Sequence, residues 1–332
     1  MNEPTPAVAL RSADSALIDE VRAVIALAEI PLVIHPPGAD PPAAALLLDS
    51  AAEVHADDPP WVGPSRRAAW VGHTGAEGTT AQLQLELPEA GEGLLTMARS
   101  ACQRRTARVI GVVGARGGVG ASALASALAR AGAHAPLGVA LVDLDHTGPG
   151  LDLMLGLEQD GGLRWADLDG QGGTLPGQAL AEALPIWHGV HVLSCDWRGE
   201  AEHGIAPAAV DALASGHDLV VLDLPRTEPS WAGYCDAVLI VTTCAAICAE
   251  AVRTTATAWT GAQQHLVVRG PARGGVTPEE IATASGVPLV LAMRPERGMA
   301  AGAERGLTPG DNRRGALRRG AGTLIKRLDL AS

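Results

Sequence analysis

The chain has 332 residues, a formal net charge of -12 and 47 % hydrophobic residues. This length predicts about two domains, each able to bury a core. The negative charge argues against non-specific nucleic-acid binding by the body of the protein, and no apolar run approaches the roughly 20 residues that span a bilayer. Five cysteines without metal-ligand spacing, and a polar start without a signal-peptide pattern, predict a cytoplasmic protein without disulfides.

The chain up to Ala101 alternates between strand and helix patterns. A helix is predicted from Asp14 to Leu27, because Leu17, Val21 and Ile25 recur on one helical face. Five strands alternating with helices indicate an α/β domain. The predicted strands and the second helix are Ala7–Leu10, Pro31–Ile34, Ala44–Leu48, Ala68–Val71, Gln82–Leu87 and Pro88–Ala101.

The segment CQRRTAR, Cys102 to Arg108, is polar and without periodicity. It predicts a linker between a first domain at 1–101 and a second domain at 109–332. The later strands are continuous Val, Leu and Ile runs separated by helical stretches, as expected when both faces of a mostly parallel, doubly wound sheet are covered. The predicted strands are Arg108–Val113, Val139–Leu144, Val190–Leu193, Leu219–Leu222, Val238–Val241, His265–Val268 and Pro288–Leu291.

A glycine-rich turn, GARGGVGAS, follows the first of these strands and precedes a helical stretch. Backbone N–H groups of such a turn, together with a helix N-terminus, form an anion site. The strict P-loop pattern is broken twice, because Ala115 stands at its first glycine and Ala121 at its lysine. A tight strand-to-helix connection is the alternative interpretation. The predicted phosphate-binding residues are Gly114, Gly117, Gly118, Val119, Gly120, Ala121 and Ser122.

Three aspartates stand at the carboxyl ends of two later strands. VDLD contributes Asp143 and Asp145, and HDLVVLDLPR contributes Asp223. In a doubly wound sheet these ends line the ligand crevice. Each aspartate alone could be a helix cap or part of a turn. Together with the glycine turn, Ser122, Asp145 and Asp223 supply the oxygen ligands that Mg²⁺ and an attacking water require, which predicts nucleotide binding.

These segments resemble the MinD/ParA ATPases. ARGGVGAS is similar to their deviant P-loop, Lys-Gly-Gly-x-Gly-Lys-Ser/Thr, and DLVVLDLPR resembles their Walker B strand. Within this family, the closer match is the CpaE/TadZ-like branch, and in that branch the septum site-determining protein Ssd group. The segments that carry this resemblance are VDLDHTGPGLDLMLGLE, GLRWADL, VPLVLAMRPERGMAAGAERG and LPEAGEGLLTMA. The resemblance implies a receiver-like (flavodoxin-like) N-terminal domain, a P-loop ATPase domain with ATP and Mg²⁺, catalytic roles for Asp145 and Asp223, and a nucleotide-dependent homodimer.

The sequence departs from this family at three positions. The signature lysine, which reaches toward a partner subunit's nucleotide, falls on Arg116, so the charge is kept on a planar guanidinium. The lysine that neutralises phosphate charge falls on Ala121, which predicts slow or absent hydrolysis because a preorganised cation is lost. Val268 and Arg269 stand where a base-contacting asparagine is often found, and base specificity is therefore left open.

Asp49 ends the predicted strand LLLD and is placed like the phosphoacceptor of a receiver. The segment RSAD after the first strand provides Asp14 but no acidic pair, and the single lysine, Lys326, lies at the far end of the chain. Without those metal ligands phosphotransfer is not expected. Asp49 is predicted to cap a helix or loop, and the domain to act as a docking module.

The C-terminal segment DNRRGALRRGAGTLIKRLDL places Leu317, Ala321, Leu324 and Leu328 on one helical face among basic residues. MinD relatives use such a tail to bind membrane. Three glycines weaken the helix, and packing on the sheet is the favoured prediction. Peripheral contact with the inner face of the membrane through this tail is the alternative.

The predicted function is a cytoplasmic, nucleotide-binding spatial regulator of septum placement, with weak or lost ATP hydrolysis and with cell-division proteins as partners. One alternative is a CpaE/TadZ-like localisation factor for pilus or secretion assembly. The other is a scaffold that binds no nucleotide. No direct nucleic-acid partner is expected, and the sequence leaves open which process is regulated.

Overall fold

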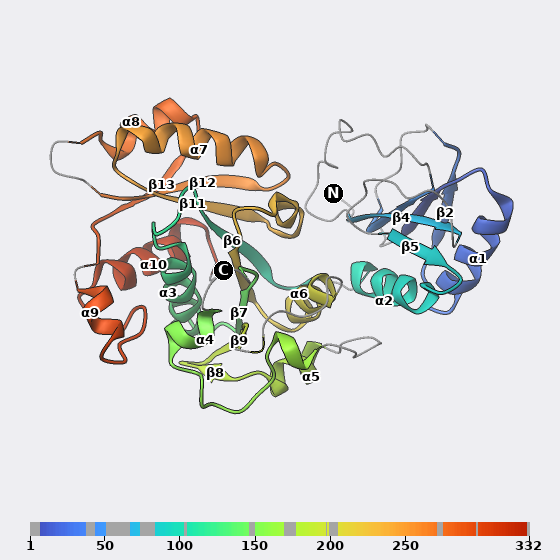
Figure 1. Ribbon diagram of the computed structural model, residues 1–332, viewed down its shortest axis with the longest axis horizontal. Helices are drawn as coiled ribbons and strands as arrows, with labels where there is room; N and C mark the ends of the chain where they lie inside the picture. Colours follow the sequence, from blue (N-terminus) through green and yellow to red (C-terminus); the bar gives the residue numbers. More distant parts are fainter. Residues whose placement is uncertain are drawn as a thin grey trace.

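The computed structural model contains two β-sheets, which lie in two neighbouring bodies (Figure 1). The first body holds the N-terminal elements, and the second holds the rest of the chain. The structure describes residues 7–37, 44–50, 67–73, 84–102, 105–145, 150–168, 177–196, 198, 205–270, 275–296 and 298–330.

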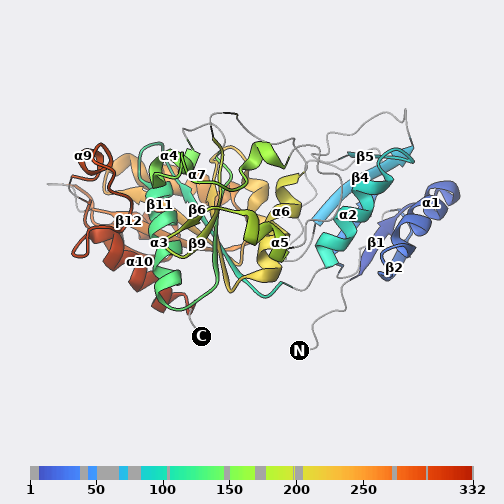
Figure 2. The ribbon, with the colours of Figure 1, turned by 90° about the horizontal axis from the view of Figure 1, so that it is seen from below.

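The first sheet is built from five short strands, accompanied by two helices. These elements are β1 (Val8–Arg11), α1 (Ser15–Ala26), β2 (Leu32–His35), β3 (Leu46–Asp49), β4 (Arg67–His73), β5 (Gln84–Leu87) and α2 (Gly91–Cys102). All neighbouring strands are parallel, in the order β2-β1-β3-β4-β5, which is the strand order of flavodoxin-like sheets. The two helices contact each other on the same side of the sheet (Figure 2).

Asp14 determines where α1 begins. Its carboxylate accepts hydrogen bonds from the backbone N–H groups of Ala16, at 2.9 Å, and Leu17, at 3.3 Å. A carboxylate at this position satisfies free N–H groups and interacts favourably with the helix dipole. The predicted helix therefore starts one residue later than expected, with Asp14 as its cap, and it buries Leu17, Val21 and Ile25 as predicted.

The second sheet has eight strands, with helices on both faces. Its first half contains β6 (Arg108–Gly114), α3 (Ala121–His134), β7 (Val139–Asp143), α4 (Gly150–Leu155), η1 (Trp165–Asp167), α5 (Gly177–Ala183), β8 (Ile186–Trp187) and β9 (Val190–Leu193). Its second half contains α6 (Ile205–Gly216), β10 (Leu219–Leu224), η2 (Pro229–Tyr234), β11 (Ala237–Thr243), α7 (Ala246–Ala258), β12 (Gln263–Arg269), α8 (Pro278–Ser285), β13 (Leu289–Met293), α9 (Met299–Ala303) and α10 (Ala316–Arg327). The strand order is β13-β12-β11-β6-β10-β7-β9-β8.

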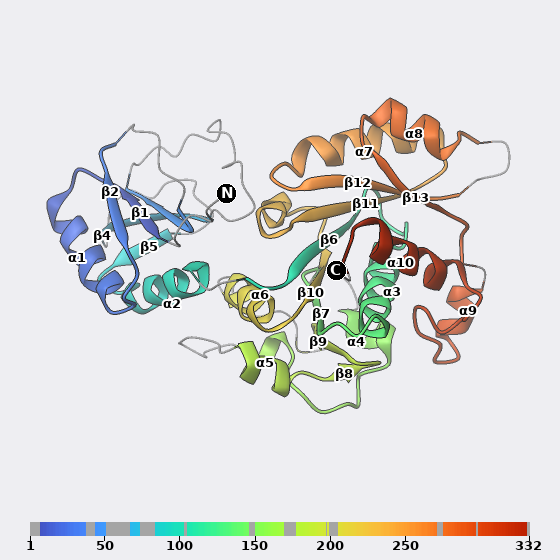
Figure 3. The same ribbon diagram turned by 180° about the vertical axis from the view of Figure 1, so that it is seen from behind.

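The strands of this sheet bury both of their faces. In β6, Val109 and Val113 join a core formed with α5, α6, α7 and α8, whereas Ile110 and Val112 join the core under α3, α4 and α10. Figure 3 shows α3 and α10 next to each other. Crossover helices of a parallel sheet cover both faces, which explains why the strands are apolar at successive positions. The predicted mostly parallel sheet is confirmed.

Strand β8 is the exception, because it pairs antiparallel with β9 at the edge of the sheet. The two-residue turn between them is His188-Gly189, with φ of +47° and +85°. Left-handed φ at both turn residues is the signature of a tight type I′ hairpin. The sequence analysis missed this strand, because two residues are too few to show alternation.

Helix α10 packs its apolar face into the core. Leu317, Ala321 and Leu324 are buried against α3 and β13. Packing is thus the outcome for this tail, and the apolar face that the alternative assigned to a membrane is not accessible. No helix in the described part of the chain is long and apolar enough to cross a bilayer.

The second half of the predicted linker is bound to the second body. Arg105 donates to Asp211 at 3.1 Å and to the carbonyl of Tyr234 at 3.0 Å. The backbone N–H of Thr106 donates to the carbonyl of Ala214 at 3.1 Å. Helix α2 also contacts α6. The chain is therefore fixed to the second body before β6 begins.

Candidate functional site

The loop between β6 and α3 has the backbone of a phosphate-binding turn. Gly118 and Gly120 have φ of +74° and +85°, which is the left-handed region that favours glycine. The N–H of Ala115 donates to the carbonyl of Val241 at 2.9 Å and fixes the start of the loop to β11. A Cβ atom added to Gly117 or Gly118 would meet nothing within 4 Å. The outer side of the loop is thus open.

The N-terminus of α3 completes this turn. Ala121 is the first residue of the helix, and Gly120 before it makes no side-chain capping bond. The first N–H groups of the helix are therefore not satisfied by a cap, and they carry the positive end of the helix dipole. The predicted residues Gly114 to Ser122 thus form one continuous strand end, loop and helix start, in which Val119 is buried and contributes through its backbone.

Acidic side chains meet at the same edge of the sheet. Asp223 near the end of β10 and Asp143 at the end of β7 are register partners on adjacent strands, and both are buried. The Ser122 side chain is close enough to Asp223 to lower the pKa of that carboxyl, and Asp145 is close enough to raise it. The structure therefore brings together Ser122, Asp145 and Asp223, as the sequence predicted.

Asp143 has a structural role that was not predicted. Its carboxylate accepts hydrogen bonds from the N–H groups of Leu151, at 2.7 Å, and Asp145, at 3.2 Å. Its carbonyl accepts from the Trp165 indole at 2.7 Å. These bonds tie α4 and η1 to the end of β7. The VDLD segment indicated the position of Asp143, but nothing in it distinguished this anchoring carboxylate from Asp145.

The buried aspartates have raised pKa values. Burial raises the pKa of Asp143 to about 6, against the lowering effect of its two backbone hydrogen bonds. Burial and then repulsion from Asp143 raise the pKa of Asp223, while the nearby Ser122 hydroxyl lowers it. Two adjacent buried carboxylates are held ionised only with a compensating cation. No three His, Cys, Asp or Glu side chains among the described residues could hold a metal by themselves.

Arg116 does not take the place of the missing lysine within its own loop. It is exposed, and its Nη1 lies 3.9 Å from Sγ of Cys248 on α7. Burial favours a higher pKa for the Cys248 thiol, but hydrogen bonds with Thr243 and Arg116 lower it. The guanidinium is thus directed from the loop toward Cys248 on α7.

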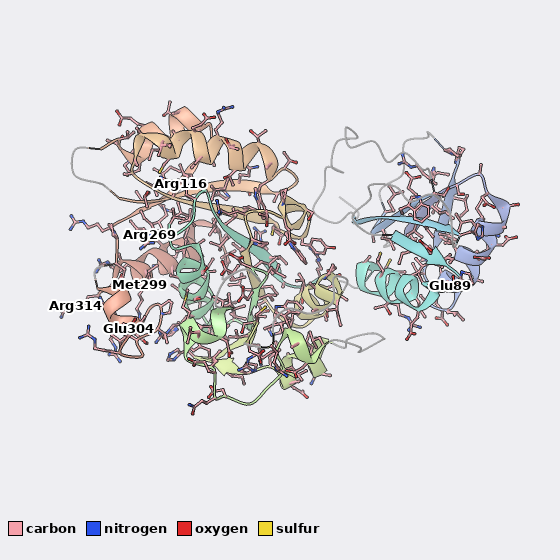
Figure 4. All side chains as sticks on the ribbon, viewed as in Figure 1. Glu89, Arg116, Arg269, Met299, Glu304 and Arg314 are labelled. Carbon is pink, nitrogen blue, oxygen red and sulfur yellow. The ribbon has the colours of Figure 1, made fainter. Side chains whose placement is uncertain are left out.

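Arg269 contacts the loop from the end of β12, a contact that the sequence analysis did not predict. Its Nη1 donates to the carbonyl of Val119. A Cβ atom added to Gly120 would overlap the same guanidinium. Arg116 and Arg269 lie at the same end of the second sheet (Figure 4). The sequence offered one signal, namely that Arg269 stands at a position where the family has a ligand-contacting residue.

The first body contains a second candidate site at Asp49. Arg11 and Asp49 are register partners at the ends of β1 and β3. The Arg11 guanidinium forms an ion pair with the Asp49 carboxylate, and both side chains are largely buried. Asp49 was predicted to cap a helix or loop, and in the structure its carboxylate forms this ion pair with an arginine on the adjacent strand.

Comparisons with known proteins agree with the geometry of the second body. The ParA family model, described as NUBPL iron-transfer P-loop NTPase, matches residues 105–227. An uncharacterized protein of Mycobacterium tuberculosis is 38 % identical over 322 residues, covering 88 % of this chain and 90 % of that protein. Within this chain, the segment that contains the glycine loop thus matches the ParA family of P-loop NTPases.

Solved structures share the fold of this ParA/MinD-type domain. The septum site-determining protein MinD from Pyrococcus horikoshii, complexed with Mg-ADP, is 20 % identical, with a TM-score of 0.53 over 67 % of this chain and 96 % of that chain. The MinC:MinD cell division protein complex from Aquifex aeolicus is 17 % identical, with a TM-score of 0.55 over 67 % of this chain and 96 % of that chain. The residues matched by the ParA model include the glycine loop, Asp145 and Asp223.

Proposed function

We propose that the ParA/MinD-type domain binds ATP with Mg²⁺ at the loop of Gly114 to Ser122. The observation that carries this proposal is the proximity of Ser122 to the buried Asp223, next to a glycine loop whose outer side is open. In this proposal the nucleotide controls assembly of the protein rather than metabolic chemistry.

The residues present fit both groups. Gly117 and Gly118 leave room over the loop for phosphate oxygens, and the uncapped start of α3 favours an anion. Ser122, Asp145 and Asp223 offer hard oxygen ligands, and Mg²⁺ is usually held by one or two carboxylates together with phosphate oxygens and water. When bound, Mg²⁺ would neutralise phosphate charge and permit the adjacent carboxylates to ionise.

In this proposal, different residues have different roles around the phosphates. The loop backbone would hold the phosphate oxygens, while Ser122 and Asp223 fix the position of the cation. Asp145, which is half-buried at the edge of the sheet, is placed to orient an attacking water. Ala121 supplies no charge, so we expect hydrolysis to be slower by roughly 10²- to 10³-fold than with a well-placed cation.

The placement of Arg116 supports the proposal of a nucleotide-dependent homodimer. The Arg116 side chain is exposed and contacts Cys248 on α7. We propose that it reaches the nucleotide of a second copy, where an arginine can stabilise phosphate charge in trans. Such a contact would couple nucleotide binding to association of two chains.

The cellular role that we propose is spatial regulation of septum placement in the cytoplasm, with cell-division proteins as partners. It is supported by the resemblance of the chain to the septum site-determining group and by the shared fold with the MinC:MinD complex. The CpaE/TadZ-like alternative is a localisation factor for pilus or secretion assembly. In both cases the first body is a receiver-like docking module that carries no phosphoryl group.

Calorimetric titration of the full chain with ATP and Mg²⁺ tests nucleotide binding. We expect saturable binding, and we expect Gly118→Val to weaken it by at least tenfold, because the new side chain occupies the open side of the loop and is strained at positive φ. The matched control is Gly156→Val, which also has positive φ and open space but lies outside the loop. Absence of wild-type binding at millimolar ATP would support the scaffold alternative.

Phosphate release measured against protein concentration separates binding from hydrolysis. Turnover should be slow in the wild type, lower in Arg116→Ala and higher in Ala121→Lys. The effect of Arg116→Ala should grow with protein concentration, because the guanidinium acts on a second copy. Brisk wild-type turnover that neither substitution changes would contradict the assignment of the two charges.

A further inference from the structure

The glycine loop lacks a cation in its own sequence, yet an arginine from a distant strand contacts it. Arg269 ends β12, and its Nη1 donates to the carbonyl of Val119 inside the loop. The strand order places β12 two strands away from β6. The long arginine side chain therefore crosses the end of β11 to reach the loop.

The guanidinium of Arg269 occupies the space beside Gly120 in which another residue would place its Cβ atom. A Cβ atom at Gly120 would overlap Nη1 and lie 3.0 Å from Cζ of Arg269. Gly120 is also the residue immediately before Ala121, where the family has its phosphate-neutralising lysine. The positive charge of Arg269 is thus held next to the position from which the lysine is missing.

The hydrogen bond to the Val119 carbonyl leaves most N–H donors of the Arg269 guanidinium available to an anion. A guanidinium has five N–H donors in a planar fork, and this bond uses one of them. The Nε atom of Arg269 is buried and has no hydrogen-bond partner among the described residues. A buried donor without a partner is costly, so a ligand that accepts from it would be stabilised.

The neighbouring carboxylate does not satisfy this charge. Burial lowers the pKa of Arg269, and Glu296 opposes that effect from nearby. The Glu296 carboxylate accepts hydrogen bonds from the Asn312 side chain, at 2.8 Å, and the Leu317 N–H, at 3.0 Å. Both of its oxygens are therefore engaged with the start of α10.

We propose that Arg269 supplies, from β12, the phosphate-binding cation that the loop lacks at Ala121. This inference rests on the proposed nucleotide site and identifies a further binding residue in it. The alternative is that the same contact opposes phosphate binding. In this alternative, called the plug, Arg269 keeps the loop closed to phosphate by its hydrogen bond to the Val119 carbonyl.

Titrations of the full chain with ATP and with AMP, each with Mg²⁺, test this assignment. Arg269→Ala should weaken ATP binding by roughly 10- to 100-fold, which corresponds to the loss of a charged hydrogen bond. AMP binding should change by less than about threefold, because AMP lacks the phosphates next to Gly120. Arg269→Lys should retain most of the ATP affinity. Arg294→Ala, at the exposed end of β13, is the matched control and should bind as the wild type does.

A double-substitution cycle makes the test specific to charge at the loop. In the Ala121→Lys background, Arg269→Ala should cost little ATP affinity, because a lysine restores the cation. Equal losses in both backgrounds would overturn the inference and indicate a structural role. Unchanged or tighter ATP binding by Arg269→Ala would overturn it in favour of the plug. If the wild type binds neither nucleotide, the proposed function itself fails, and Arg269 has no phosphate to serve.

Discussion

The side chain opposite Asp49 determines which chemistry is open to that carboxylate. Phosphoryl transfer to an aspartate requires a carboxylate oxygen that can attack phosphorus and a metal ion that neutralises the incoming charge. In this chain a guanidinium from the adjacent strand forms an ion pair with the carboxylate. Arg11 thus takes the place that a metal would need beside Asp49.

We therefore expect no phosphorylation of the first body. Incubation of the full chain with acetyl phosphate and Mg²⁺ should leave its intact mass unchanged, because Asp49 is already neutralised by Arg11. The measurement is mass spectrometry of the intact protein, with Asp49→Asn as the control. A stable phosphate adduct in the wild type that is lost in the control would show that the ion pair opens.

A pair of histidines, one buried and one half-buried, is expected to make the fold sensitive to acid. Nδ1 of His191 on β9 lies 2.9 Å from Nε2 of His217, whose Nδ1 donates to the carbonyl of Leu213 at 2.8 Å. Burial lowers the pKa of both imidazoles, and the mutual repulsion of the pair lowers that of His191 further, while Asp218 opposes the effect at His217. The folded state therefore keeps the pair neutral.

Stability should fall as the pH drops from about 7 to about 5. The pKa values of the two histidines are lower in the folded than in the unfolded chain, so acid protonates the unfolded chain first and shifts the equilibrium toward it. Urea unfolding at both pH values measures this loss, which should shrink in His191→Gln. An identical pH dependence in the wild type and the variant would exclude the histidine pair as its source.

Some residues of the candidate site could be predicted from the sequence, and others could not. Ser122, Asp145 and Asp223 were predicted because parallel strands end at one edge of a sheet, so strand ends in the sequence imply proximity in space. The contact of Arg269 with Val119 joins residues 150 positions apart. It depends on the order of β12, β11 and β6 and on an arginine rotamer, neither of which a local pattern encodes.

At the scale of single elements, α10 is the helix whose pattern admitted two interpretations. A basic helix with one apolar face is expected both for a membrane-surface helix and for a last helix packed on a sheet. The neighbours in space decide between them, and here they are α3 and β13. Helical periodicity predicted which side chains are buried, but it did not predict what buries them.

Leu324→Ala should lower the free energy of unfolding by about 2 to 5 kcal/mol, because it leaves a cavity in a fully buried position. Lys326→Ala, on the exposed side of the same helix, should change it by less than about 0.5 kcal/mol. Denaturant unfolding measures both. Unchanged stability of Leu324→Ala, with reduced sedimentation on anionic vesicles, would instead show that this face binds membrane.

At the scale of the whole molecule, the succession of strands and helices along the chain could be predicted from the sequence. The spatial order of the strands within each sheet could not. Continuous apolar runs between helical stretches predicted a parallel sheet, since crossover helices must cover both faces. The edge hairpin at Ile186–Trp187 escaped prediction because its pairing depends on one tight turn. The placement of the two bodies relies on contacts such as that of α2 with α6, which join segments remote in sequence.

The anchoring of Arg105 and Thr106 limits how the protein can be cut into parts. A fragment that begins at the first strand, Arg108, would lack the guanidinium that faces the buried Asp211. That carboxylate would lose its ion pair with Arg105, at a cost in folding free energy. A fragment of the second body that keeps this ion pair therefore starts ahead of Arg105 and carries part of the connecting segment with it.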